Sequence, residues 1–263
     1  MAPRHVAWKR RIGRIFSGPA VRRARSVILT HHAVGSGRAS LPLDRFKEQT
    51  DWLARNARVV PVDALLESTE EHGLRVALTF DDGYACVATA VAPVLQQAAL
   101  AATVFLNTAC VGDTQAISSD ERLGHAFGEK FLVWSEVRAL HELGWSIGSH
   151  GADHVDLTRL QNAEVHAQLR ESKAAIEGRL GAKCRQFAYT WGNHDARVRA
   201  AVAQCGYDLA LAGVHGAVLP SSDHFAIPRI DIRSDYELED FIAVVRGDWD
   251  YLGLVQKVRR LLP

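Results

Sequence analysis

Several features that would define a function class at once are missing from this sequence. It has four cysteines, Cys86, Cys110, Cys184 and Cys205, with no CxxC pair and no tight spacing, so we expect reduced thiols rather than disulfides. No run approaches the roughly 18 apolar residues of a membrane span, and the basic start is not followed by the apolar segment of about 7 to 15 residues that a secretory signal needs. These absences predict a cytoplasmic protein.

The chain as a whole also has no large excess of positive or negative charge, because the net charge of its 263 residues is +1. We therefore expect no nucleic-acid partner. The charge is nevertheless uneven, since residues 1–25 carry eight Lys and Arg and no acid. We interpret them as a basic N-terminal arm that is either a solvated tail or a peripheral contact with the inner membrane face. Its apolar side chains would then insert among the headgroups; they are Trp8, Ile12, Ile15 and Phe16.

Short apolar runs alternate with segments of helical periodicity along the rest of the chain. The expected strands include "SVILTHH", "VALTF", "ATVFLNT", "WSIGS", "QFAYTW", "LALAG" and "AIPRIDI". Runs that are apolar throughout are typical of parallel strands covered on both faces by crossover helices. Six or more such units predict an α/β fold with a closed or nearly closed barrel of about seven strands, and an open doubly wound sheet is the alternative. We expect one domain over residues 26–263, with a long binding or mobile loop at 111–130.

Polar side chains follow several of these strands at the point where each strand ends. In a barrel of this kind the carboxyl ends of the strands form one rim, where reacting groups collect. The residues that we expect at this rim are His31, His32, Asp81, Asp82, His150, Trp191 and Gly192.

The pair His150 and His154, spaced i and i+4, offers two imidazoles that can converge on one ion. Asp82 could add a carboxylate, which completes a ligand set typical of a catalytic metal site, and Asp81 would then be free to accept a proton. The zincin pattern HExxH is absent because Gly151 stands in place of the glutamate. The simpler alternative is that Asp82 and Gly83 only turn the chain and that His154 decorates a loop.

Three motifs contain most of these residues: "TFDDGY" at 79–84, "IGSHGADHVDLTRL" at 147–160 and "FAYTWG" at 187–192. Their order and separations resemble those of the polysaccharide deacetylases, the family-four carbohydrate esterases. The resemblance covers roughly residues 26–245. It implies a distorted (β/α) barrel and a divalent metal, usually zinc, held by Asp82, His150 and His154. It further implies that Asp81 is the base for a metal-activated water and that the backbone N–H of Trp191 helps to hold the oxyanion.

The chain departs from the common pattern of that family at three places. The C-terminal Leu-x-His motif that usually supplies the acid is absent from "AIPRIDI". The chain resembles instead the exopolysaccharide N-deacetylase subgroup, whose acid lies near the N-terminus, which assigns the role to His32; the weaker candidates are His31, His215 and His224. Thr190 replaces a proline, and Ala188 stands where an arginine usually orients the base. Arg229 could replace that arginine by pairing with Asp81.

An acetylated amino sugar is the substrate that the resemblance implies, as a polymer, an oligosaccharide or a lipid-linked sugar. We expect its contacts among Tyr84, Trp191 and Asn193, because flat rings pack on sugar faces and polar groups fix hydroxyls. A glycosidase is disfavoured, since adjacent acids cannot flank a bond from two sides. A non-catalytic carbohydrate-binding descendant and a hydrolase of another small amide stay open.

Overall fold

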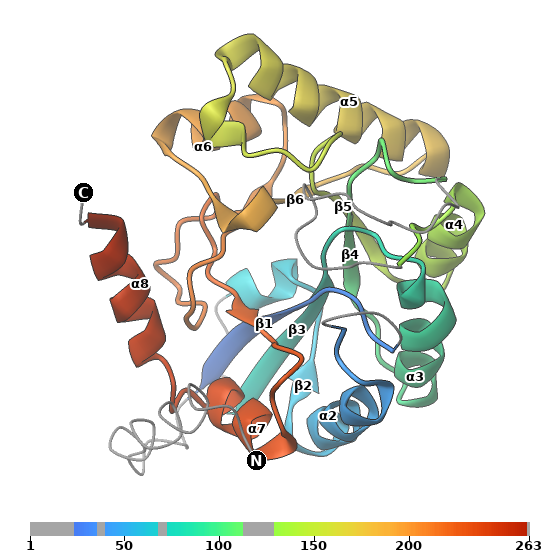
Figure 1. Cartoon of the computed structure of the whole chain (residues 1–263), viewed down its shortest axis with the longest axis vertical. Coiled ribbons are helices and arrows are strands. Elements are labelled where there is room, and N and C mark those ends of the chain that lie inside the picture. Colours follow the sequence, from blue (N-terminus) through green and yellow to red (C-terminus); the bar gives the residue numbers. More distant parts are fainter. Residues whose placement is uncertain (1–23, 36–39, 68–72, 113–128, 262–263) are drawn as a thin grey trace.

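Parallel strands form the centre of the molecule, and helices surround them (Figure 1). The computed structural model describes residues 24–35, 40–67, 73–112 and 129–261. Most of the predicted basic arm at 1–25 and most of the predicted loop at 111–130 therefore lie outside the described residues. Within them, one eight-stranded sheet has the order β7-β6-β5-β4-β3-β1-β8, and β2 pairs with β3 beside that path. The strands are β1 Arg25–His31, β2 Arg58–Val59, β3 Leu74–Phe80, β4 Thr103–Leu106, β5 Ser146–Ser149, β6 Gln186–Ala188, β7 Leu209–Leu211 and β8 Ile230–Asp231.

Seven α-helices are found in the described residues, and six of them follow the periodic segments of the sequence. They are α2 Leu43–Asn56, α3 Ala92–Gln97, α4 Trp134–Glu142, α5 Asn162–Leu180, α6 Ala196–Gln204, α7 Leu238–Arg246 and α8 Tyr251–Leu261. The helix expected after β3 begins with a wider π-helical turn at Val87–Val91 before it continues as α3. The helix α8 was not predicted: Tyr251 and Leu252 at its start pack against the core, and Leu254, Val255 and Val258 are exposed. No helix in the described ranges is long and apolar enough to cross a lipid bilayer.

The strands are apolar because both faces of the sheet are covered. In β3 every residue after Leu74 is buried, and β1 and β4 show the same pattern in their central residues. At about 25 cal/mol per Å² of buried apolar surface, such a core is the main contribution to the stability of the fold. The expectation of near-continuous apolar runs in parallel strands is confirmed.

The barrel stays incomplete between β7 and β8, the two ends of the strand order. Irregular chain between these strands fills the gap: Val218 N–H donates to Ser26 O at 2.8 Å, and Arg229 N–H donates to Val214 O at 3.0 Å. The sheet is therefore a curled, distorted (β/α) barrel with seven strands on its main path. This confirms the fold predicted from the sequence and excludes the doubly wound alternative.

Candidate active site

Two adjacent acids follow β3 where the chain makes a sharp turn. Asp82 has φ 70° and Gly83 has φ 74°, so both residues are left-handed. This conformation costs an L-residue such as Asp82 roughly 1–2 kcal/mol. A side chain at Gly83 would also meet Leu106 Cδ2 at 2.9 Å. The turn holds Asp81 and Asp82 at the rim with both side chains buried, and a strained non-glycine residue of this kind is typical of functional sites.

Asp82 faces two imidazoles in the interior of the rim. Its Oδ1 lies 3.5 Å from Nε2 of His150 and 3.5 Å from Nε2 of His154. One ligand atom from each of the three residues lies within 4.8 Å of the others, and all three residues are buried. The second oxygen of Asp82, Oδ2, is buried and has no hydrogen-bond partner at ordinary distance in the described part of the chain, although the buried Tyr84 hydroxyl is near enough to interact with the Asp82 carboxylate. Such an orphaned buried carboxylate oxygen is costly unless a cation or donor satisfies it.

The two histidines are held in defined orientations. Nδ1 of His150 lies 2.7 Å from the carbonyl oxygen of Ala188. A carbonyl can only accept, so Nδ1 carries a proton and Nε2 is the ring nitrogen that faces Asp82. The turn that carries His154 is fixed by Gln168, which accepts from Asp153 N–H at 2.8 Å and donates to Asp153 Oδ2 at 2.9 Å. One carboxylate and two imidazoles arranged in this way fit the donor preference of zinc.

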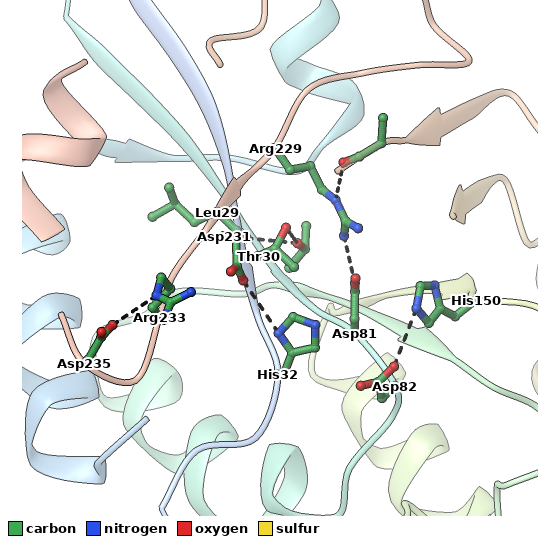
Figure 2. A network of polar contacts seen from close by, with 12 residues as sticks. Leu29, Thr30, His32, Asp81, Asp82, His150, Arg229, Asp231, Arg233 and Asp235 are labelled. Atoms are coloured by element: carbon green, nitrogen blue, oxygen red, sulfur yellow. Dashed lines mark hydrogen bonds and ion pairs between the residues drawn. The ribbon is translucent and has the colours of Figure 1, made fainter. Parts of the chain in front are cut away.

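Asp81 points away from this cluster toward Arg229 (Figure 2). Nη1 of Arg229 donates to Asp81 Oδ1 at 2.8 Å, and its Nε donates to Ala212 O at 3.1 Å. Both side chains of the pair are about 95 % buried. Burial by itself would raise the pKa of the Asp81 carboxyl, but the charge and hydrogen bond of Arg229, with the nearby His150 and His32, outweigh it and lower the pKa to about 2. Arg229 therefore stabilises the ionised form of Asp81.

Replacing Arg229 with methionine should destabilise the fold by at least about 3 kcal/mol, because Asp81 would remain as a buried carboxylate without its partner. The double variant Asp81→Asn, Arg229→Met should recover most of that loss, since it buries no charge at the pair. Urea unfolding of the wild type, both single variants and the double variant measures the coupling. Additive effects of the two replacements would show that the pair contributes nothing beyond its separate side chains.

His32 follows β1 and lies on the side of Asp81 opposite to His150 (Figure 2). Its side chain is 28 % exposed, and its Nδ1 lies 3.8 Å from Oδ1 of Asp231, which ends β8. His31 lies in a different environment: it is buried, and its ring stacks on Phe80 at 5.1 Å. Burial lowers the pKa of His31 to about 3, so this side chain stays neutral and cannot serve as an acid near pH 7.

The other two histidines that the sequence suggested as acids lie outside the cavity. His215 faces Asp250, with its Nε2 3.6 Å from Oδ1, and lines a separate groove. His224 is exposed and is absent from the residues that line the cavity. Of the four candidates, only His32 lines the same cavity as Asp81.

The cavity has a volume of about 310 Å³. Its wall includes two acids, three histidines and the chain beyond β6 and β7, but not Asp82. The residues that form it are Thr30, His32, Asp81, His150, His154, Trp191, Gly192, Ala212, Gly213, Arg229, Asp231 and Gln256. Trp191 is 49 % exposed and left-handed with φ 51°, and its ring contacts that of His154 edge-on at 4.4 Å. Its backbone N–H has no hydrogen-bond acceptor among the described residues.

Two expected substrate contacts lie elsewhere. Tyr84 is completely buried and stacks on Phe131 at 5.7 Å, so its ring is a core residue and not a wall of the cavity. Asn193 donates to Asp156 Oδ2 at 3.1 Å and is likewise absent from the cavity wall. In both cases the type of side chain was compatible with either a sugar contact or a structural role. The contacts in the folded protein give both residues a structural role. Thr190 also has a structural contact, since its hydroxyl donates to the carbonyl of Val155.

Three residues near the site were not predicted. Asp231 ends β8 within "PRIDI", and Asn107 directly follows β4, so the rule that polar residues collect at strand ends could have identified both. Nδ2 of the buried Asn107 approaches Asp82 Oδ1 at 3.5 Å. Gln256 comes from α8, a helix that was not predicted, and the rule for strand ends could not have identified it.

The incomplete barrel and the acids and imidazoles gathered at its rim define the chain as an α/β-barrel protein with an enzyme-like site. A family model described as polysaccharide deacetylase matches residues 69–210, which is more than half of the chain. The protein therefore belongs to the polysaccharide deacetylase family, as the three motifs indicated. Membership supports carbohydrate deacetylation, which is the hydrolysis of acetyl groups from sugars, as its activity.

Similar proteins come from several bacteria. YxkH of Bacillus subtilis (strain 168), a protein assigned to the polysaccharide deacetylases, is 24% identical over 216 residues, which are 80% of this chain and 72% of that protein. Among solved structures, IcaB from Ammonifex degensii superposes with a TM-score of 0.71 at 20% identity, over 86% of this chain and 99% of the other. The Streptococcus pyogenes deacetylase PplD, solved in complex with acetate, gives a TM-score of 0.70 at 17% identity, over 84% and 98%. At these identities the two structures show that the fold is shared.

Proposed function

We propose that this protein is a divalent-metal-dependent hydrolase that removes acetyl groups, most simply N-acetyl groups, from an amino sugar. Asp82, His150 and His154 would hold the metal, with zinc as the best match to one carboxylate and two imidazoles. When bound there, such a cation supplies a Lewis acid that acidifies water and polarises a carbonyl oxygen.

The chain's own groups account for the proton transfers of amide hydrolysis. The Asp81 carboxylate, kept ionised by Arg229, takes a proton from the attacking water as that water forms the new bond to the acetyl carbon. His32, held beside Asp231, gives a proton to the sugar nitrogen when its bond to that carbon breaks. Acetate and the free amine leave. Between the attack of water and the departure of the amine, the acetyl carbonyl oxygen carries negative charge, and the backbone N–H of Trp191 donates to it. The exposed Trp191 ring offers a flat surface to the sugar.

One observation carries this proposal: the buried Asp82 has Oδ2 unpartnered and two imidazole nitrogens 3.5 Å from Oδ1. Those two histidines line the same cavity as the adjacent Asp81, which is paired with Arg229. A carbohydrate-binding descendant would need neither the orphaned carboxylate nor the buried ion pair. Each of these features is costly in a protein that does not use it.

The purified protein is expected to contain about one zinc per chain and to release acetate from N-acetylated amino sugars. Removal of the metal by a chelator should abolish acetate release, and added zinc should restore it. His154→Ala should lose the metal, whereas His224→Ala, an exposed histidine outside the cavity, should retain it. Metal analysis and acetate assays on a panel of sugars measure both. Zinc at full occupancy without acetate release from any sugar would favour the binding-protein alternative.

We further propose that the protein works in the cytoplasm. The described residues include all four cysteines and hold no disulfide, which fits a protein of a reducing compartment. Burial raises the pKa of the Cys86 and Cys184 thiols to about 12, as is typical of structural thiols. Fractionation of cells that express the full chain tests this, and recovery outside the cell envelope would contradict it.

A further inference from the structure

Asn107 is a completely buried amide directly after the carboxyl end of β4. In the sheet this strand lies between β3 and β5, the strands that precede the acid and the first histidine of the metal-ligand cluster. Backbone hydrogen bonds fix the chain on both sides of the amide. His150 N–H donates to Leu106 O at 2.8 Å, before it. Thr108 N–H donates to Gly151 O at 3.2 Å, after it. Asn107 is therefore held rigidly next to the segment that carries the histidines.

One end of this amide has a partner and the other end has none. Nδ2 of Asn107 lies 3.5 Å from Asp82 Oδ1, the oxygen that also faces the two imidazoles. The opposite orientation of the amide would place two acceptors together. Asn107 Oδ1 is buried and has no hydrogen-bond partner among the described residues. A half-satisfied buried amide is costly, and a leucine of similar size would avoid that cost. Packing therefore does not explain this amide, whereas the carboxylate that it faces does.

The two adjacent acids have donors of different charge. Asp81 is paired with the guanidinium of Arg229. Asp82, within the described residues, faces the imidazoles and the neutral amide of Asn107. A guanidinium beside Asp82 would neutralise the carboxylate and repel a cation. A neutral amide orients the carboxylate and leaves its negative charge to attract a cation. The choice of donor thus separates an acid that stays ionised as a base from an acid that can bind metal.

We propose that Asn107 is a positioning residue of the metal site, which holds the Asp82 carboxylate with Oδ1 toward His150 and His154. The inference rests on the proposed function, because the amide has this role only where a cation binds the cluster. It assigns that role to a residue outside the three motifs of the sequence. Hydrogen-bond partners that orient a metal ligand in this way typically contribute about 10- to 100-fold to metal affinity.

The zinc affinity of the full chain tests this proposal without any substrate. Asn107→Leu keeps the approximate size of the side chain, Asn107→Ala adds no bulk, and both remove the donor. Each should weaken zinc binding about 10- to 100-fold, measured by competition with a chromophoric chelator. With Co²⁺ in place of zinc, the visible absorption spectrum of both variants should differ from that of the wild type. The reason is that the spectrum depends on the coordination geometry, to which the Asp82 carboxylate contributes.

Tyr207→Phe is the matched control, because it also removes a buried polar group. The Tyr207 hydroxyl donates to Leu169 O at 2.9 Å, and Tyr207 belongs neither to the cluster nor to the cavity wall. This variant should unfold at a lower temperature and keep the zinc affinity and Co²⁺ spectrum of the wild type.

Thermal unfolding shows which variants are folded, and either Asn107 variant alone is sufficient for the test. Wild-type zinc affinity in a folded Asn107 variant would overturn this inference and leave the proposed function intact. An equal loss of affinity in Tyr207→Phe would also overturn it, because general loosening of the fold would then explain the effect. A wild type that binds no zinc would overturn the proposed function and this inference together.

Discussion

Replacing Asp81 with asparagine is expected to leave zinc bound and to lower acetate release by about a thousandfold or more, the contribution of a well-placed general base. The same replacement one residue later, Asp82→Asn, is expected to remove the zinc as well. The two carboxylates are adjacent in the chain but have different partners. Asp81 is bound by Arg229, whereas Asp82 faces His150 and His154 with one oxygen unpartnered.

Asparagine is the right replacement at both positions for a physical reason. Asp82 has φ 70°, and asparagine is among the few residues that adopt the left-handed conformation readily, so the turn should survive. Alanine would add backbone strain to the loss of the carboxylate. Metal analysis after dialysis and acetate assays on both variants separate the roles. Loss of zinc from Asp81→Asn with retention in Asp82→Asn would reverse the assignment, and full activity in either variant would remove that residue from the mechanism.

Much of the barrel could be predicted because burial on both faces leaves a simple pattern. The run "VALTF" is apolar throughout, and its strand is covered on both sides. Parallel strands run in one direction, so their carboxyl ends lie at the same rim. This alone predicted that Asp82, His150 and His154 lie close together, and side-chain packing did not have to be known. Those three residues come from two strand ends that are not adjacent in the sheet order, with β4 between them.

The rest could not be predicted, because it depends on contacts that sequence spacing does not encode. The pairing of Arg229 with Asp81, which joins residues 148 positions apart, is confirmed, but it was suggested only because the arginine that is usual in the family was missing and not by any rule of sequence spacing. Tyr84 and Asn193 have side-chain types found both in sugar sites and in cores, and only packing against Phe131 and a bond to Asp156 distinguish the two. The helix α8 was not predicted, although its apolar residues are periodic: Tyr251 and Leu252 pack against the core, and Leu254, Val255 and Val258 are exposed.

The assignment of His32 depends most on structure, because four histidines competed for one role. Burial eliminates His31, and position eliminates His215 and His224. His32 remains in the cavity with Asp81 on one side and Asp231 on the other (Figure 2). Asp231 does not touch the reacting atoms in this arrangement, so it would act as a positioning residue that orients the imidazole through Nδ1. The need for such an acid depends on the leaving group, which provides a specific test.

His32→Ala is expected to lower kcat/KM for an N-acetylated amino sugar by roughly a thousandfold, because an amine cannot leave without a proton. The same variant should lose less than about tenfold on 4-nitrophenyl acetate, whose leaving group departs as a stable anion and needs no acid. Asp81→Asn should lose activity on both substrates, and Asp231→Asn should lose activity on the amide alone and to a smaller extent. Because His32 is outside the cluster of Asp82, His150 and His154, zinc content should not change. Undiminished amide hydrolysis by His32→Ala would refute the assignment. An equal loss on both substrates would mean that His32 acts in the attack of water and not in the departure of the amine.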